Sequence, residues 1–250
     1  MNLLRKVIKS CFPLLPWKFW GPRYVIRFGK VRERSQFRKF QVGKGSYVDP
    51  SVRILGWRNV VVGNNAILSE DVWLNVNHRD EETKRIIIGN NCHIGKRNFF
   101  SAGPVIHIKD YSFTGIDCHF LGCAHVTDSP MVPYLASGLT LGDIIEVGVN
   151  CWLTTSVTVI QGVRIGCGSV IGARSVVVND IPPFSIAMGN PCKVIKRYDF
   201  KNNRWVDISA WTTELEKLIP TESEYLALLK TKYGKIPLAL IASSRRFGWL

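Results

Sequence analysis

Between residues 147 and 181 an apolar residue recurs at every sixth position, and this period constrains the fold of the 250-residue chain more than any other feature. A second set of small or apolar residues follows four places after each member of the first. A helix repeats every 3.6 residues and a simple strand every two, so neither explains a period of six. Short strands separated by tight turns do explain it. The first set is Val147, Leu153, Val159, Ile165, Ile171 and Val177, and the second is Cys151, Val157, Val163, Ser169, Ser175 and Ile181.

Members of the two sets that lie two residues apart point to the same face of a strand, so the residue between them points outward. The turns then fall at the three remaining positions of each repeat, where Gly and Asn tolerate the backbone angles of tight turns. A strand this short buries its inner face only by stacking on the next coil, so the repeat predicts an all-β solenoid, a parallel β-helix. The expected outward residues are Trp152, Thr158, Arg164, Val170 and Val176, and the turns include Gly148-Val149-Asn150 and Gly172-Ala173-Arg174.

The repeat continues into Asp180-Ile181-Pro182-Pro183 and Gly189-Asn190-Pro191-Cys192-Lys193-Val194-Ile195, and together these stretches resemble the hexapeptide-repeat acetyltransferases. The resemblance implies a left-handed parallel β-helix with three sides per coil. The left hand rests on the resemblance alone, because the general preference for right-handed crossovers predicts the opposite. The expected domains are a basic amphipathic N-terminal segment, a β-helix acyltransferase domain with two loops, and a C-terminal helical extension. They span residues 1–41, 42–197 (loops at 77–86 and 126–144) and 198–250.

Positive charge is concentrated at the start of the chain. The formal net charge is +14, and residues 1–45 contain twelve Lys or Arg against a single acidic residue, Glu33. This bias favours an anionic partner such as a membrane surface or an acidic glycan. Nucleic acid is the weakest alternative, because the basic residues form no known nucleic-acid reading motif.

Residues 1–28 mix apolar, basic and aromatic side chains. Lys9 and Pro13 interrupt the apolar run, so we expect neither a membrane-spanning helix nor a cleaved signal peptide. Basic residues beside Trp17 and Trp20 suit a segment that lies at the lipid headgroups of an anionic membrane. A basic cap on the open end of the solenoid fits equally well. The seven Cys show no paired spacing, so we expect them to be reduced packing residues. Reduced cysteines indicate a cytoplasmic protein, and if residues 1–28 bind lipid, we expect the protein at the inner face of the membrane as a peripheral protein.

The β pattern stops after Lys196-Arg197. Thr221-Glu222-Ser223-Glu224 predicts a capping box, followed by a helix to about Lys232, and a shorter helical stretch is expected near residues 214–218. We expect these helices to cap the solenoid or to brace a neighbouring subunit.

Three histidines, His107, His119 and His125, occupy outward positions. His107 and His125 are eighteen residues apart, the length of one full coil in the resembled family, so we expect them on one face. The resemblance implies that His125 is the general base, which removes the acceptor's hydroxyl proton, with His119 as the second candidate. The family often has an acidic residue before this His, whereas this chain has Ala124. The orienting partner is therefore left open between Asp128 and a backbone carbonyl.

A metal site is not expected. The γ-type carbonic anhydrases share the resembled scaffold and bind zinc through three His, and catalytic zinc needs three protein ligands and an open position. His119 and His125 are six residues apart, which places them on different faces of a coil.

No phosphate-binding glycine loop occurs, so the co-substrate is implied by the resemblance alone. In similar enzymes acetyl-CoA lies in a groove between two subunits of a homotrimer. Carried over position by position, the resemblance assigns Thr155 and Ala173 to the pantetheine arm, Val178 and Asn179 to the adenine end, and Lys193 and Lys196 to the phosphates.

The stretch Lys196-Arg197-Tyr198-Asp199-Phe200 is similar to the subgroup that O-acetylates sugars. The acceptor implied is a sugar hydroxyl of a cell-surface polysaccharide or of its lipid-linked precursor. Two alternatives remain open from the sequence. One is a soluble acetyltransferase that acts on xenobiotics or small sugars, and the other is a non-catalytic β-helix that serves as a scaffold.

Overall fold

A computed structural model describes residues 41–79, 83–140 and 142–234. All the described residues belong to one compact unit. The membrane segment expected within residues 1–28, and all but the last residue of the expected N-terminal segment, lie outside the described residues. No described helix combines the length and the hydropathy needed to cross a membrane.

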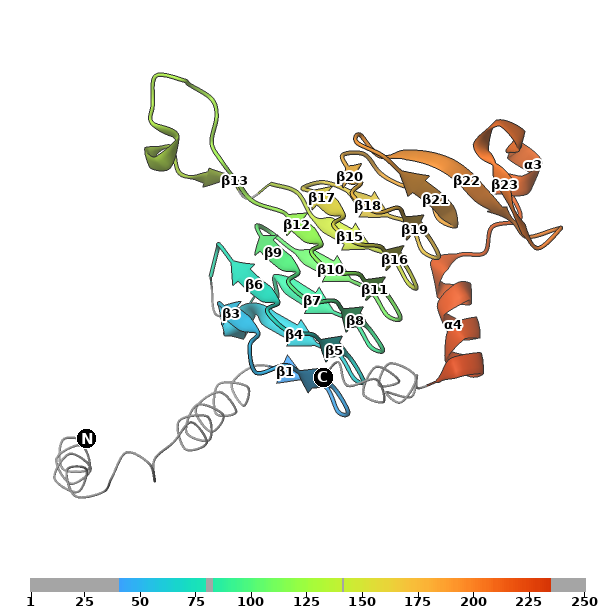
Figure 1. Ribbon diagram of the computed structural model, residues 1–250, viewed down its shortest axis with the longest axis horizontal. Coiled ribbons are helices and arrows are strands. Elements are labelled where there is room, and N and C mark those ends of the chain that lie inside the picture. The colour runs from blue at the N-terminus through green and yellow to red at the C-terminus, as the bar shows by residue number, and fades with distance from the viewer. Residues whose placement is uncertain (1–40, 80–82, 141, 235–250) are drawn as a thin grey trace, which may run out of the picture. The chain divides into compact units, whose positions relative to one another are not determined.

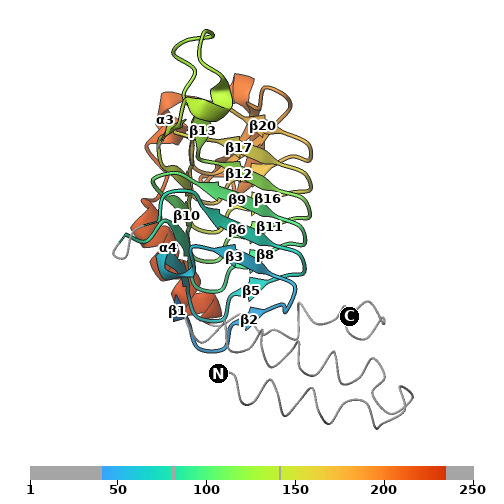
Figure 2. The same cartoon turned by 90° about the vertical axis from the view of Figure 1, so that its left-hand side faces the viewer.

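The chain winds repeatedly through three parallel sheets, which we call faces A, B and C (Figures 1 and 2). Each coil contributes one strand to each face, and each strand pairs in parallel with its counterpart in the next coil. Face A contains β1 (Gln41–Val42), β4 (Val60–Val62), β7 (Ile86–Ile88), β10 (Ile106–Ile108), β15 (Ile145–Val147) and β18 (Arg164–Ile165). Face B contains β2 (Tyr47–Val48), β5 (Ile67–Leu68), β8 (His93–Ile94), β11 (Phe113–Thr114), β16 (Trp152–Leu153), β19 (Val170–Ile171) and β21 (Ser185–Met188). Face C contains β3 (Arg53–Leu55), β6 (Trp73–Val76), β9 (Phe99–Ala102), β12 (His119–Leu121), β17 (Thr158–Ile160) and β20 (Val176–Val177).

The inward residues expected from the repeat form the core. Every member of the two sets between residues 147 and 181 is at most 4% exposed, whereas Trp152, between two of them, is 47% exposed. The register explains the burial, because each inward residue lies directly above its counterpart in the preceding coil, as Val159 lies between Phe120 and Val177. Phe100 and Phe120 stack inside the coils with ring centroids 4.5 Å apart. The prediction of short parallel strands broken by turns every six residues is therefore confirmed.

The corners are tight because successive coils approach each other closely there. A Cβ atom added to Gly63 would lie 2.6 Å from the carbonyl carbon of Gly89 in the next coil, so only glycine fits. Other corners place a non-glycine residue in the left-handed region, as at Asn150, with φ of 52°. The sequence pattern of Gly and Asn at these positions follows from this geometry.

Two excursions interrupt the coils where loops were expected. The first lies between β6 and β7, so Ile86, which we had placed in the loop, already belongs to a strand. The second, between β12 and β15, we call the arm. It projects from the coils in both views (Figures 1 and 2) and contains the antiparallel pair β13 (Ala124–His125) and β14 (Leu139–Thr140), with a short 3-10 helix, η4 (Tyr134–Ala136). Another 3-10 helix, η3 (Trp57–Asn59), precedes β4.

The expectation that β structure ends after Arg197 is wrong. Strand β22 (Lys193–Asp199) folds back antiparallel on β21, and β23 (Arg204–Asp207) pairs with β22, so face B gains a twisted hairpin. Strand β22 is antiparallel to both of its neighbours, so the hairpin does not follow the six-residue period of the coils on which the expectation rested. After the hairpin come the 3-10 helix η5 (Ile208–Ala210) and the helices α3 (Thr213–Glu216) and α4 (Glu222–Tyr233).

Helix α4 begins with the expected capping box, in which the Thr221 and Glu224 side chains each bond the other residue's backbone N–H. It runs along the side of the coils (Figure 1), so the expectation that it caps their end is wrong. Apolar residues at the turns between faces A and B, among them Tyr111 and Val149, form the stripe against which Leu229 of the helix packs. Lys109 of the coils also forms an ion pair with Glu222, at 2.8 Å.

Candidate active site

His125, the expected general base, lies at the root of the arm. Strand β13 pairs with β14 so that His125 is opposite Leu139, and the bond from Val126 N to the Gly138 carbonyl, 3.1 Å, continues the pairing. The His125 side chain is exposed. Among the described residues, neither Asp128 nor a backbone carbonyl is hydrogen-bonded to its ring, so the structure identifies no orienting partner within one chain.

The expectation that His107 and His125 share a face is wrong. His107 lies on face A, in register with Ile87 and Glu146, and is half-buried. His125 lies outside the coils, because the arm begins after Leu121. Eighteen residues correspond to one coil only where no loop is inserted, so this spacing does not place His125 on the face of His107. Burial lowers the pKa of His107, and Lys109 lowers it further. His107 is therefore a neutral packing residue at pH 7.

His119 lies on face C at the start of β12, the last strand that the chain forms in the coils before the arm. Its ring is exposed and meets the edge of Phe99, with centroids 6.4 Å apart. Trp73 stands below Phe99 in the same column, 4.9 Å from it and 44% exposed. This aromatic column was not among the features expected from the sequence. The signal was available, since Trp73, Phe99 and His119 occupy the same outward position in three successive coils.

Three of the residues assigned to the cofactor converge at the turns that join face B to face C, which we call the B–C corner. Thr155 follows β16 and Ala173 follows β19, and a bond of 2.9 Å from Arg174 N to the Thr155 carbonyl stacks the two turns. The turn after β21 covers the same corner, because Val176 N bonds the Gly189 carbonyl at 3.0 Å. This turn leads into Lys193, whose side chain is exposed.

The other three assigned residues lie elsewhere. Val178 and Asn179 follow β20 at the opposite end of face C, where the chain turns toward face A, and the arm leaves the coils at this same C–A corner after Leu121. Lys196 lies within β22, opposite Ile186 on one side and Asp207 on the other. One chain therefore presents Thr155, Ala173 and Lys193 at one edge of face C, and the His125 arm with Val178 and Asn179 at the other edge. Sequence spacing does not reveal this division, because it does not say which turn belongs to which corner.

Polar side chains gather on face C close to the root of the arm. Asn77 donates from Nδ2 to Ser101 Oγ at 2.8 Å and to the Ala102 carbonyl at 3.2 Å, and Asn75 donates from Nδ2 to Asn77 Oδ1 at 2.8 Å. The Ser101 carbonyl in turn accepts from Gly122 N, the residue at which the arm begins, at 2.9 Å. This polar cluster was likewise not expected from the sequence. Amide and hydroxyl groups of this kind can bond the hydroxyls of a polar acceptor.

Cys123 lies next to the candidate base but is not a candidate nucleophile. Burial raises the pKa of its thiol, and Sγ donates to the Thr140 carbonyl at 3.3 Å. The thiolate is the nucleophilic form of cysteine, so the protonated thiol reacts poorly at neutral pH. Among the described residues, no three His, Cys, Asp or Glu side chains are arranged to hold a metal ion.

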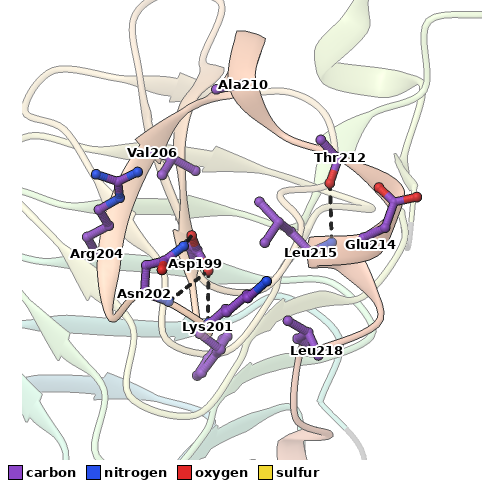
Figure 3. A pocket seen from close by; sticks show the side chains of 11 residues that line it. Asp199, Lys201, Asn202, Arg204, Val206, Ala210, Thr212, Glu214, Leu215 and Leu218 are labelled. Atoms are coloured by element: carbon purple, nitrogen blue, oxygen red, sulfur yellow. Dashed lines mark hydrogen bonds between the residues drawn. The ribbon is translucent and has the colours of Figure 1, made fainter.

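A hollow of about 930 Å³ lies in the C-terminal extension, between the β22–β23 hairpin and α3 (Figure 3). Asp199 organises its wall, because its carboxylate accepts hydrogen bonds from Lys201 N at 2.8 Å and from Asn202 Nδ2 at 2.7 Å. These bonds hold the hairpin turn and lower the pKa of Asp199. The hollow contains none of the residues expected from the sequence to bind substrate or cofactor.

Comparison with known proteins gives relatives among acetyltransferases. No protein-family model matches the chain. It is 40% identical over 112 residues to the putative acetyltransferase SACOL2570 of Staphylococcus aureus (strain COL), a match that covers 45% of this chain and 55% of that protein. It is 29% identical over 180 residues to the galactoside O-acetyltransferase of Escherichia coli (strain K12), covering 70% and 82%. The chain thus spans about half the length of the first curated relatives it matches.

Among solved structures, the chain is similar to a single-residue mutant of AntD, an N-acyltransferase from Bacillus cereus, in complex with dTDP and coenzyme A. The TM-score is 0.55 at 18% identity, and the match covers 78% of this chain and 95% of that one. AntD from the same organism, in complex with dTDP and 3-hydroxybutyryl-CoA, gives the same TM-score at 18% identity and covers 80% and 96%. The chain therefore has the fold of an acyltransferase and sequence relatives that are acetyltransferases.

Proposed function

We propose that this protein is an acetyl-CoA-dependent O-acetyltransferase that acetylates a sugar hydroxyl, with His125 as the general base. The observation that carries the proposal is the position of His125, exposed at the root of an arm that leaves face C beside a polar cluster. The curated relatives support the transferase class.

The chemistry requires a group that accepts the proton of the attacking hydroxyl. Neutral imidazole at His125 would accept it as the sugar oxygen attacks the thioester carbonyl of acetyl-CoA. The new C–O bond forms, a hydrogen-bond donor stabilises the oxyanion of the tetrahedral intermediate, and the C–S bond then breaks. The imidazolium returns its proton to the departing thiolate, which leaves His125 neutral for the next turnover.

The division of the assigned residues between two corners supports a site shared by two chains. A cofactor that reaches both Thr155 and a His125 imidazole would lie between the B–C corner of one chain and the C–A corner of a neighbour. The arm also carries apolar side chains that nothing in the described chain covers, including Met131 at 88% and Leu135 at 90% exposure. Head-to-tail contacts of this kind form a closed ring when the rotation between subunits closes, and a threefold rotation would give the homotrimer implied by the family resemblance.

The acceptor we favour is a sugar of a cell-surface polysaccharide or of its lipid-linked precursor. The basic composition of residues 1–28 supports a position at an anionic membrane surface, at the inner face where such precursors are assembled. A galactoside is the acceptor class named for one relative. A free small sugar or a xenobiotic remains the alternative acceptor, and activity on it would not depend on residues 1–28.

The test is acetyl-CoA turnover, followed as thiol release with a panel of free sugars and lipid-linked oligosaccharides. We expect His125→Ala to lower kcat by about 10²–10⁴-fold, the range for loss of a general base, while acetyl-CoA binding stays within a few-fold. His107→Gln is the control, because His107 lies on face A away from the arm. Equal loss in both variants, or full activity in His125→Ala, would refute the role of His125. A larger loss in His119→Ala would transfer that role to His119.

A further inference from the structure

Five residues in the left-handed region occupy equivalent positions at successive turns of the B–C corner. Their φ angles lie between 56° and 58°, and each amide from the second onward bonds the preceding turn, as Asp117 N bonds the Lys96 carbonyl at 3.0 Å. The side chains therefore form a column along the corner. In order along the coils they are Asp71, Arg97, Asp117, Ser156 and Arg174.

The cations in the lower part of this column form ion pairs with carboxylates. Arg97 donates to both carboxylate oxygens of Asp117, from Nε and from an Nη, at 2.8 Å each. This bidentate pair lowers the pKa of Asp117. Beside it, Lys96 forms an ion pair with Glu70 at 3.2 Å. Each of these two cations therefore has its own carboxylate.

The upper part of the column is not paired. Arg174 is exposed and forms no ion pair or side-chain hydrogen bond with any described residue, and the same holds for Lys193, the first residue of β22. Backbone bonds bring these two residues close together, because Val176, two residues after Arg174, begins β20, and its carbonyl accepts from the amide of Cys192, the residue before Lys193, at 2.9 Å. Lys196 differs, since it lies opposite Asp207 across β22 and β23.

Turn geometry does not explain an arginine at position 174. The left-handed region favours Gly, Asn and Asp, and a long side chain gains nothing there. Arg97, the other arginine of the column, is explained by its pairing with Asp117. An unpaired arginine beside Ala173, in the turn stacked on that of Thr155, is instead suited to a bidentate contact with a phosphate group.

We infer that Arg174 binds phosphate of the acyl donor together with Lys193, so that the phosphorylated end of coenzyme A lies at the top of the B–C corner. The inference rests on the proposed function. The uncharged pantetheine arm would then run down the corner past Ser156, the small neutral residue between the paired and the unpaired charges. Arg174 thereby adds a residue that the family resemblance did not assign.

The test is equilibrium binding of coenzyme A, dephospho-coenzyme A, pantetheine and dTDP to the full-length protein, for the wild type and two variants. Arg174→Asn removes the cation and keeps a residue that tolerates positive φ. Arg97→Asn is the matched control, with the same change at the same position of a lower coil. We expect Arg174→Asn to weaken coenzyme A binding by about 10–100-fold, the range for a charged hydrogen bond, and pantetheine binding by less than about twofold. Arg97→Asn should change neither.

The probes separate the possible failures. A loss that disappears with dephospho-coenzyme A places Arg174 at the 3′-phosphate, and a loss that persists places it at the diphosphate. Coenzyme A binding in Arg174→Asn that matches the wild type, an equal loss for pantetheine, or a loss for dTDP alone would overturn the inference while the proposed function stands. Failure of the wild type to bind coenzyme A at all would overturn the proposed function and this inference with it.

Discussion

Replacing Ser112 by alanine tests how the coils are joined inside the core. Ser112 is 1% exposed and lies at an inward corner position. Its hydroxyl donates to the Gly148 carbonyl at 2.7 Å and accepts from Cys151 N at 3.0 Å, so it bridges to the backbone of the next coil. The serines at the equivalent positions of later coils make the same kind of bridge: Ser169 to the Pro182 carbonyl and Ser185 N, and Ser175 to Gly189 N.

The expected loss of stability follows from the backbone groups that lose their hydrogen-bond partner in Ser112→Ala. Cys151 is 1% exposed and the hydroxyl is the partner the structure gives for its N–H, so the variant buries an unpaired donor, which costs about 1–3 kcal/mol. The lost bond to the Gly148 carbonyl adds about 0.5–1.5 kcal/mol. We therefore expect the free energy of unfolding to fall by about 1.5–4.5 kcal/mol. For a fold of this size each kcal/mol lowers Tm by about 2–4 °C, which gives a decrease of about 3–18 °C.

The assay is urea unfolding followed by circular dichroism at one fixed protein concentration, since any oligomer makes stability depend on concentration. Ser223→Ala is the control, because Ser223 is exposed in the first turn of α4, and we expect a change within about 0.5 kcal/mol. If Ser112→Ala loses no more than Ser223→Ala, with an unchanged m value, the inward serines do not join the coils as argued.

Two further predictions concern titratable groups. Burial lowers the folded-state pKa of His93 and His107, so the unfolded chain binds protons that the folded chain does not, and we expect the free energy of unfolding to fall as pH decreases from about 7 to about 5. Urea unfolding midpoints measured across this pH range check the dependence of stability on pH, which should become weaker when both histidines are changed to Gln. An unchanged pH dependence in that double variant would contradict the assignment of this effect to His93 and His107. Burial raises the pKa of Cys92 and Cys151 to about 12, so neither thiol should react with Ellman's reagent at a pH of about 8 in the folded protein, whereas Cys123, half-buried at the arm, should react slowly. Reaction of Cys92 or Cys151 before unfolding, identified by mass spectrometry, would show that the core opens locally.

The sequence determined the repeating architecture because burial in a coil depends only on position within six residues. Val159 and Ser175 could be placed in the core and Trp152 on the surface without any long-range information. The helix α4 was equally readable, since its capping box is local. The hairpin β22–β23 was not, because its antiparallel strands do not follow the six-residue period on which the prediction relied.

The candidate site shows where local pattern stops being sufficient. The sequence, through its family resemblance, supplied His125, Thr155, Ala173 and Lys193 as candidates. Only the tertiary structure decided that these residues lie at two edges of face C, and that His107 belongs to another face altogether. The physical reason is that corners and arms depend on how strands of different coils stack. Whether a charge such as Arg174 is paired or free likewise depends on neighbours that are distant in the chain.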